Sequence, residues 1–225
     1  MNLHLGQQLS GERVVELFDQ TADLVEAFIP NGTGGFIHYQ TGASIHFENR
    51  HFMHKNFEFL IPALGKGTYE AYFKVRSRQM VNVILVYRTL ERFVQYTLTE
   101  YFTFGLFYGM IILFSFNNLL MYFAVRGRQY LYYVLYILCV GLYEMSSDGI
   151  AFQYLWPEHP WFNQYATAVF VCCVSVFALL FTKSLLHVKQ KEPRVNKLLD
   201  AVIILRILFF VYCLCFNQNW FIYKF

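Results

Sequence analysis

TFGLFYGMIILFSFNNLLMYFA, residues 103–124, contains no charged side chain. A helix rises about 1.5 Å per residue, so about 22 residues reach about 33 Å, and the hydrocarbon core of a bilayer is about 30 Å thick. The stretch therefore predicts a membrane-spanning helix.

Three more apolar stretches follow, at about 130–148, 165–183 and 199–216. The whole chain is 56% hydrophobic and only 15% charged, whereas about a quarter of the residues in a soluble domain are charged. We therefore expect residues 96–225 to form an α-helical bundle of four spans in a lipid bilayer. The net charge of +3 is small and no basic helix is present, so a nucleic-acid partner is not expected.

The loops between the predicted spans differ in charge. The first holds Arg126 and Arg128, the third is rich in lysine, and the second, YLWPEHPWFNQY (154–165), has neither Lys nor Arg. Because basic loops stay on the cytoplasmic side, this pattern predicts a multi-pass protein of the inner (cytoplasmic) membrane with an extracytoplasmic N-terminal domain. The aromatic rings of the second loop suit the headgroup layer.

Residues 1–95 show the alternation of β-strands. Tight-turn residues separate short runs in which apolar and polar side chains alternate, which is typical of an antiparallel sandwich. We expect a jelly-roll-like all-β domain that is incomplete at its start. The predicted strands are VVELF (14–18), LVEAFIP (24–30), FIHYQ (36–40), SIHFEN (44–49), NFEFLIPA (56–63), YEAYFKVRS (69–77) and MVNVILVYR (80–88).

No pattern of a known catalytic site is present: HExxH, GxSxG and GxxxxGK[ST] are all missing, so an enzyme and catalytic residues are not expected. The five cysteines all lie in the apolar half and make no CxxC pair. Four histidines, His38, His46, His51 and His54, lie close together, but their spacing matches no closed ligand pattern. We therefore expect neither a metal nor a cofactor.

The best candidates for ligand contact lie on one predicted loop of the β domain. Arg50 stands between Asn49 and His51 directly after a predicted strand. A solvated loop arginine is the alternative interpretation.

Five polar residues lie in or beside the predicted spans. Arg206 is about seven residues into the fourth span and either reaches the cytoplasmic side or pairs within the bundle. Asn117 and Asn118 can hydrogen-bond between helices. Glu144 and Asp148, four residues apart at the outer end of the second span, form either a paired-carboxylate cation site or an ordinary water-facing pair.

The stretch from Gly105 to Ala166 resembles the bacterial seven-transmembrane receptors with diverse intracellular signalling modules. The β domain resembles the end of that family's jelly-roll sensor domain, through the stretch from Gly42 to Arg50 and the runs FEFLIPA and YFKVRS. The features that carry the first resemblance are Gly105, Tyr108 and Gly109; Asn117 or Asn118; Arg126 and Arg128; Tyr130 to Tyr133; and Gly149 with Gln153 to Pro157.

The resemblance implies a transmembrane receptor in which the outer domain binds a small ligand, carbohydrate or a similar solute, and the helices pass the change to a cytoplasmic output module. Such receptors have seven spans and an output module, whereas this chain supplies four spans and none of the module. We therefore expect a fragment, with a natural short protein as the alternative. A transporter or channel component is the second function considered, although the prolines lie in loops and not in mid-span. A homodimer is left open.

Overall fold

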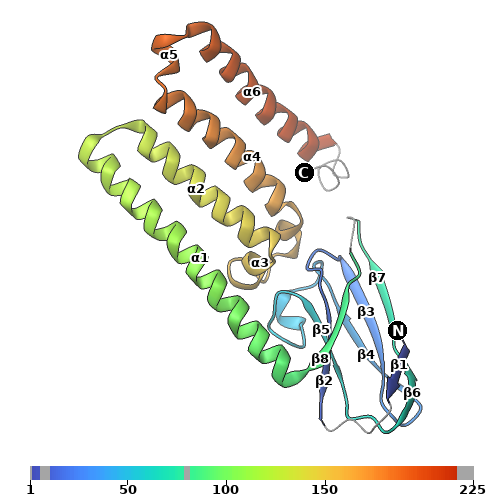
Figure 1. The fold of residues 1–225 in the computed structure, drawn as a ribbon. Helices are drawn as coiled ribbons and strands as arrows, with labels where there is room; N and C mark the ends of the chain where they lie inside the picture. Colours follow the sequence, from blue (N-terminus) through green and yellow to red (C-terminus); the bar gives the residue numbers. More distant parts are fainter. Residues whose placement is uncertain (1, 6–10, 79–81, 217–225) are drawn as a thin grey trace. The chain divides into compact units, whose positions relative to one another are not determined.

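The computed structural model describes residues 2–5, 11–78 and 82–216, which fold into two compact units (Figure 1). The first unit contains Met1–Phe102 and Asp148–Gln164, and the second contains Thr103–Ser147 and Tyr165–Phe225. The loop predicted between the second and third spans therefore folds with the β domain.

Eight strands form among the described residues, and every pairing is antiparallel. One sheet has two strands, ordered β1-β6, and the other two have three strands each, ordered β5-β2-β8 and β4-β3-β7. The strands are β1 (Asn2–Leu5), β2 (Arg13–Leu17), β3 (Leu24–Pro30), β4 (Phe36–Thr41), β5 (Phe57–Ile61), β6 (Gly67–Glu70), β7 (Tyr72–Arg76) and β8 (Leu85–Thr89).

The hydrophobic core lies between the two three-stranded sheets. Val15 of β2, Ala27 of β3 and Phe59 of β5 are all fully buried in it. Because side chains of a strand alternate between its two faces, Glu16 points away from this core, as Glu58 of β5 does. The expected antiparallel sandwich is confirmed, and its β5-β2-β8 sheet is buried on the outer face as well.

Two of the predicted strands are wrong in detail. SIHFEN forms no strand; its last residues make the 3-10 helix η1 (Phe47–Asn49), because Phe47 is buried against the ring of Phe152 and its backbone N–H donates to Pro157 O. YEAYFKVRS divides at the buried Ala71 into β6 and β7, which pair in different sheets. Residues 80 and 81 of the last predicted strand lie outside the described residues, and the strand that forms, β8, begins only at Leu85.

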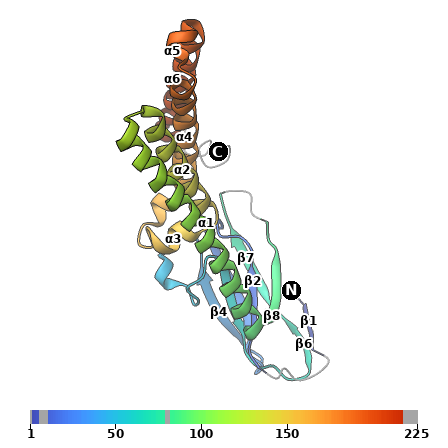
Figure 2. The ribbon, with the colours of Figure 1, turned by 60° about the vertical axis from the view of Figure 1, so that its left-hand side comes forward.

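A single helix, α1 (Leu90–Val125), starts directly after β8 and has 36 residues. The side chain of Thr89 caps its start, since its Oγ1 accepts the N–H of Arg92 at 3.2 Å. The first turns lie beside β2 and β8 in both views (Figures 1 and 2), where Phe93 is buried. The helix therefore begins between about three and four turns before the apolar stretch that predicted it.

The second unit holds the remaining long helices. Among the residues that the structure describes, three helices are long and apolar enough to cross a membrane: α1, α4 (Pro160–Leu185) and α6, whose apolar window is Pro193–Cys215. Their surfaces remain apolar, with Leu113 63% and Phe123 67% exposed, as lipid-facing helices require. The other helices are α2 (Arg128–Ser147), α3 (Ile150–Tyr154) in the first unit, and α5 (Val188–Lys191); α6 itself runs Pro193–Phe216.

The helix α2 forms where the second span was predicted but is less apolar than the other three, since it is rich in tyrosine. Its neighbours pack closely on it: Ile111 of α1 lies against Gly141, and the rings of Tyr133 and Phe181 of α4 are 5.4 Å apart. The structure thus supports three spans, and the fourth stays a prediction.

Candidate functional site

A cavity of about 340 Å³ opens in the β domain at strands β4 and β5 and the loop after η1. Both strands are edge strands of their sheets, so backbone and side-chain polar groups are available beside aromatic rings. Pockets for small molecules combine apolar walls with a few placed polar groups in this way. The lining residues are His38, Tyr39, Gln40, Thr41, Asn49, Arg50, His51, Asn56, Phe57, Glu58 and Phe59.

All three residues predicted to contact a ligand line this cavity. Asn49 ends η1 and is exposed, and the exposed His51 holds its ring 5.5 Å from that of Tyr39. The sequence placed these side chains on one loop, and the fold adds Gln40 and Thr41 from β4 opposite them. Their contact with a ligand stays a prediction.

Arg50 is buried and has a structural part in the cavity wall. Its Nη1 donates to the backbone carbonyls of His54, Lys55 and Asn56 at 2.9, 2.7 and 3.2 Å. Its guanidinium lies between two rings, 4.3 Å from the centroid of Phe47 and 4.6 Å from that of Phe57. Burial lowers the pKa of Arg50 to about 10, so it remains charged at neutral pH and holds the loop before β5 in place.

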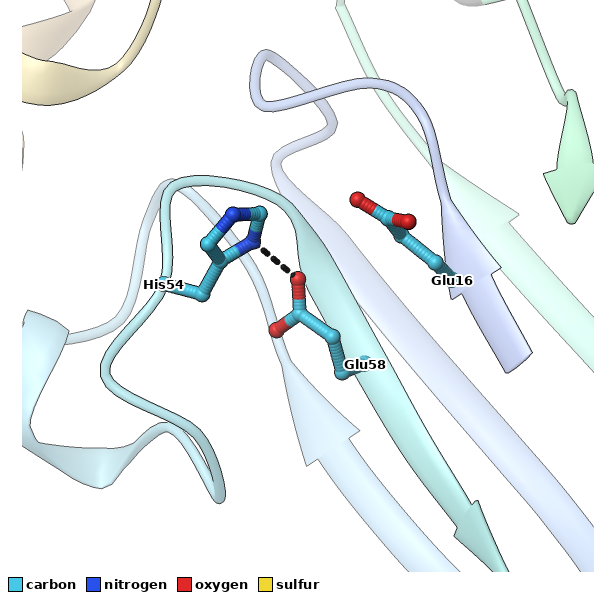
Figure 3. Close-up of side chains that lie close together, drawn as sticks. All are labelled: Glu16, His54 and Glu58. Carbon is cyan, nitrogen blue, oxygen red and sulfur yellow. Dashed lines mark hydrogen bonds and ion pairs between the residues drawn. The ribbon is translucent and has the colours of Figure 1, made fainter. Parts of the chain in front are cut away.

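Glu58 of the cavity wall and Glu16 behind it are buried carboxylates that face each other, which the sequence did not predict. Glu16 of β2 and Glu58 of β5 are directly paired across the ladder, and like charges so placed repel. Each has its own partner: Asn56 Nδ2 donates to Glu16 Oε1 at 2.7 Å, and Arg88 Nη2 lies 3.4 Å from Glu16 Oε2. Glu58 Oε1 is 2.5 Å from His54 Nδ1 (Figure 3).

The same network reaches the start of α1. Glu100 on α1 lies 2.9 Å from Lys55 Nζ through Oε1, and its Oε2 lies 3.6 Å from His54 Nε2. The His54 ring packs between the rings of Phe93 and Tyr101, with centroid separations of 5.4 and 5.6 Å. A buried ionic network therefore joins the sandwich to the helix that enters the membrane.

Within the network the pKa values of His54 and Glu58 are raised, and, although burial acts in the opposite direction, the cations beside Glu100 lower the pKa of that carboxyl to about 2. Burial disfavours a charged imidazole, but the neighbouring carboxylates of Glu100 and Glu58 outweigh it and raise the pKa of His54 to about 9. Burial raises the pKa of Glu58 to about 7, although its hydrogen bond with His54 acts in the opposite direction. The native pair therefore binds protons more tightly than the two separate side chains would.

Three potential metal ligands come together here: Glu16, His54 and Glu58, whose ligand atoms lie within 4.8 Å of one another. However, each buried carboxylate already has a cation of its own. Arg88 faces Glu16, His54 faces Glu58 and Lys55 faces Glu100. A protonated imidazole cannot bind a metal, and the raised pKa of His54 favours that form. We therefore interpret the cluster as an ionic network.

The loop Asp148–Gln164 docks onto the same part of the β domain. Gln153 bridges two elements, since its Oε1 accepts the hydroxyl of Tyr101 at 2.5 Å and its Nε2 donates to Met53 O at 2.9 Å. Gly149 has a φ of 77°, and a Cβ there would meet Gln20 at 3.0 Å. The Gly–x₃–Gln motif of the loop thus serves this docking.

The five polar residues predicted in or beside the membrane lie on helices or at their ends. Arg206 is half-buried in α6, and Asn118 donates to Phe114 O of its own helix at 2.9 Å, while Asn117 is exposed. Glu144 is half-buried in α2, and Asp148 follows that helix directly. Their proposed roles stay predictions.

Two family models match the chain. Residues 100–225 match the family described as "7TM diverse intracellular signalling", and residues 1–89 match "7TMR-DISM extracellular 2". Neither a curated protein nor a solved structure matches it. The extracellular family model matches the β domain, and the 7TM family model matches the helices that follow it. The chain therefore belongs to the seven-transmembrane receptors with diverse intracellular signalling modules, as a multi-pass membrane sensor with an extracellular β domain.

Proposed function

We propose that the cavity of the β domain binds a small neutral polyhydroxyl ligand, a mono- or disaccharide, and that its occupancy is passed through α1 to a cytoplasmic output module. The chain would then signal without catalysing a reaction, from the inner membrane of a bacterium. The observation that carries the proposal is the make-up of the cavity wall. Amide, hydroxyl and imidazole groups of Gln40, Thr41, Asn49 and His51 stand beside the ring of Tyr39.

These groups suit a sugar for two reasons. Amide side chains both donate and accept, so they match the paired hydroxyls of a sugar ring, and an aromatic ring offers an apolar face to its C–H groups. The two charged members of the wall, Arg50 and Glu58, are buried and already have partners. A strongly charged ligand would therefore find little to offset its charge.

The proposal is tested by binding of glucose, galactose, maltose and lactose to the detergent-solubilised chain, followed by isothermal titration calorimetry. We expect at least one sugar to bind, and Asn49→Ala or Gln40→Ala to weaken that binding about tenfold or more, since each removes hydrogen bonds worth about 1–2 kcal/mol. Lys66→Ala is the control, because Lys66 is exposed on the same domain and does not line the cavity. Binding that survives both cavity variants unchanged would contradict the site.

A further inference from the structure

We propose that His54 is a proton-dependent link between the cavity wall and α1: protonated, it holds Glu58 of the wall and Glu100 of the helix together. The link rests on the proposed function only in assuming that the cavity takes a ligand. Its contacts lie entirely within the first unit.

On the cavity side, the link begins at two lining residues. Glu58 and Asn56 both line the cavity and both belong to the buried network, since Glu58 contacts His54 and Asn56 donates to Glu16. In protonated His54 the Nδ1–H donates to Glu58 Oε1 across the 2.5 Å contact, and the Asn56 N–H, 3.3 Å from Nδ1, can donate to that nitrogen only when it carries no proton. A ligand group that bonds to Glu58 therefore competes directly with His54.

On the helix side, the protonation state of Nε2 decides whether His54 attracts or repels Glu100. Nε2 faces Oε2 of Glu100 at 3.6 Å in buried surroundings, and neither atom has a hydrogen-bond partner at this separation. A protonated Nε2 attracts the carboxylate, whereas a bare Nε2 sets a lone pair against a negative oxygen. Because solvent screens buried charges much less than exposed ones, this difference is larger here than it would be at the surface.

Other charged groups surround His54, and they set how much of the contact depends on its proton. Lys55 also binds Glu100, so α1 would be loosened and not released when His54 loses its proton. The charged and titratable groups that face His54 or its partners are Glu16 on β2, Glu58 on β5, Arg88 on β8, Tyr96, Glu100 and Tyr101 on α1, Arg50 and Lys55 in its own loop, and Asp148 in the loop after α2.

The first test follows the imidazole itself. The full chain, labelled with ¹⁵N-histidine and held in detergent micelles, is titrated by NMR, and His54→Gln identifies the His54 signal. We expect His54 to titrate well above the ordinary histidine range, and both Glu58→Gln and Glu100→Gln to lower its midpoint by about one pH unit or more. Glu48→Gln, an exposed change in η1, should leave it unaltered. A midpoint that either partner variant leaves unchanged overturns the link.

The second test reads the helix. Amide hydrogen exchange of residues 90–102, corrected for intrinsic exchange, should rise several-fold as pH increases from neutral to about 10, and His54→Gln should abolish that dependence while His46→Gln keeps it. At neutral pH Glu58→Gln should also raise this exchange, but not in a His54→Gln background. An equal response with and without His54 overturns the proposal. Neither test uses a sugar. Failed sugar binding would therefore reject the proposed ligand and leave the His54 link standing. A failed titration or exchange test would reject the link and leave the proposed ligand standing.

Discussion

Glu16 and Glu58 face each other directly across β2 and β5, with exposures of 0% and 5%. Two buried like charges at this position cost stability unless each is paired. Their partners come from two other elements, which are β8 through Arg88 and the loop before β5 through His54 and Asn56. The arrangement therefore fixes the loop and the sheet to each other, and through Glu100 it fixes both to α1.

The pairing predicts how the stability of the β domain depends on pH. The pKa values of both His54 and Glu58 are raised in the native state, to about 9 and about 7, so the native state holds more protons than the unfolded chain. The contribution of this pair is fully present below the unfolded values and is lost as pH rises through about 5 to 9. The loss should be on the order of 3 kcal/mol, measured by hydrogen exchange of β2 and β5 amides at several pH values.

His54→Gln should flatten the part of this dependence above pH 7, and His46→Gln, an exposed histidine, should keep it. A β domain that becomes more stable between pH 7 and 9 would contradict the assignment of the proton to the pair.

From the contacts of Arg50 we expect that lysine cannot replace arginine at this position without loss of stability. Its planar group donates to three carbonyls while lying between Phe47 and Phe57, and an ammonium group cannot match both functions. Arg50→Lys should therefore destabilise β5 by about 2 kcal/mol and Arg50→Ala by about 3 kcal/mol or more, as measured by exchange of β5 amides. Arg76→Lys, on the exposed face of β7, is the matched control, and equal effects of the two lysine substitutions would refute this role.

From the surroundings of Gly149 we expect that the loop after α2 docks with its backbone close to Gln20. Gly149→Ala would place a Cβ 3.0 Å from Gln20 at a φ of 77°, which costs about 1–2 kcal/mol for an L-residue even without the clash. We expect faster proteolysis within residues 150–156 of the purified chain. The control is Gly65→Ala, where a Cβ meets only ordinary contact at 3.7 Å. If both variants resist protease equally, the loop does not dock in this way.

Much of the fold could be predicted from local patterns. The strands at 13–17, 24–30 and 57–61 alternate clearly, and the absence of charge in 103–124 marks a membrane helix. The errors arise where distant residues decide. Phe47 turns the chain into η1 because Phe152 and Pro157, over a hundred residues away, complete its surroundings. Hydropathy likewise finds only the apolar part of α1 and not the polar turns that pack on the sheet.

Only part of the candidate site could be predicted from the sequence. Asn49, Arg50 and His51 are neighbours in the chain, so their loop could be recognised, but the wall that β4 contributes could not. The pairing of Glu16 with Glu58 depends on strand register across 42 positions, and Glu100 joins only because α1 starts directly at Leu90. The one available signal was a pair of isolated acids, Glu16 and Glu58, at polar positions of otherwise apolar strands.

We expect the β domain and the docked loop to lie outside the cell and the lysine-rich connection between α4 and α6 to lie inside. Cysteines introduced at Glu158 and Lys191, both exposed, in a chain whose native cysteines are replaced, can be labelled on intact cells with a membrane-impermeant maleimide. We predict that position 158 is labelled from outside and that position 191 is labelled only after the cells are permeabilised. Labelling of position 191 on intact cells, with protection of position 158, would contradict the account.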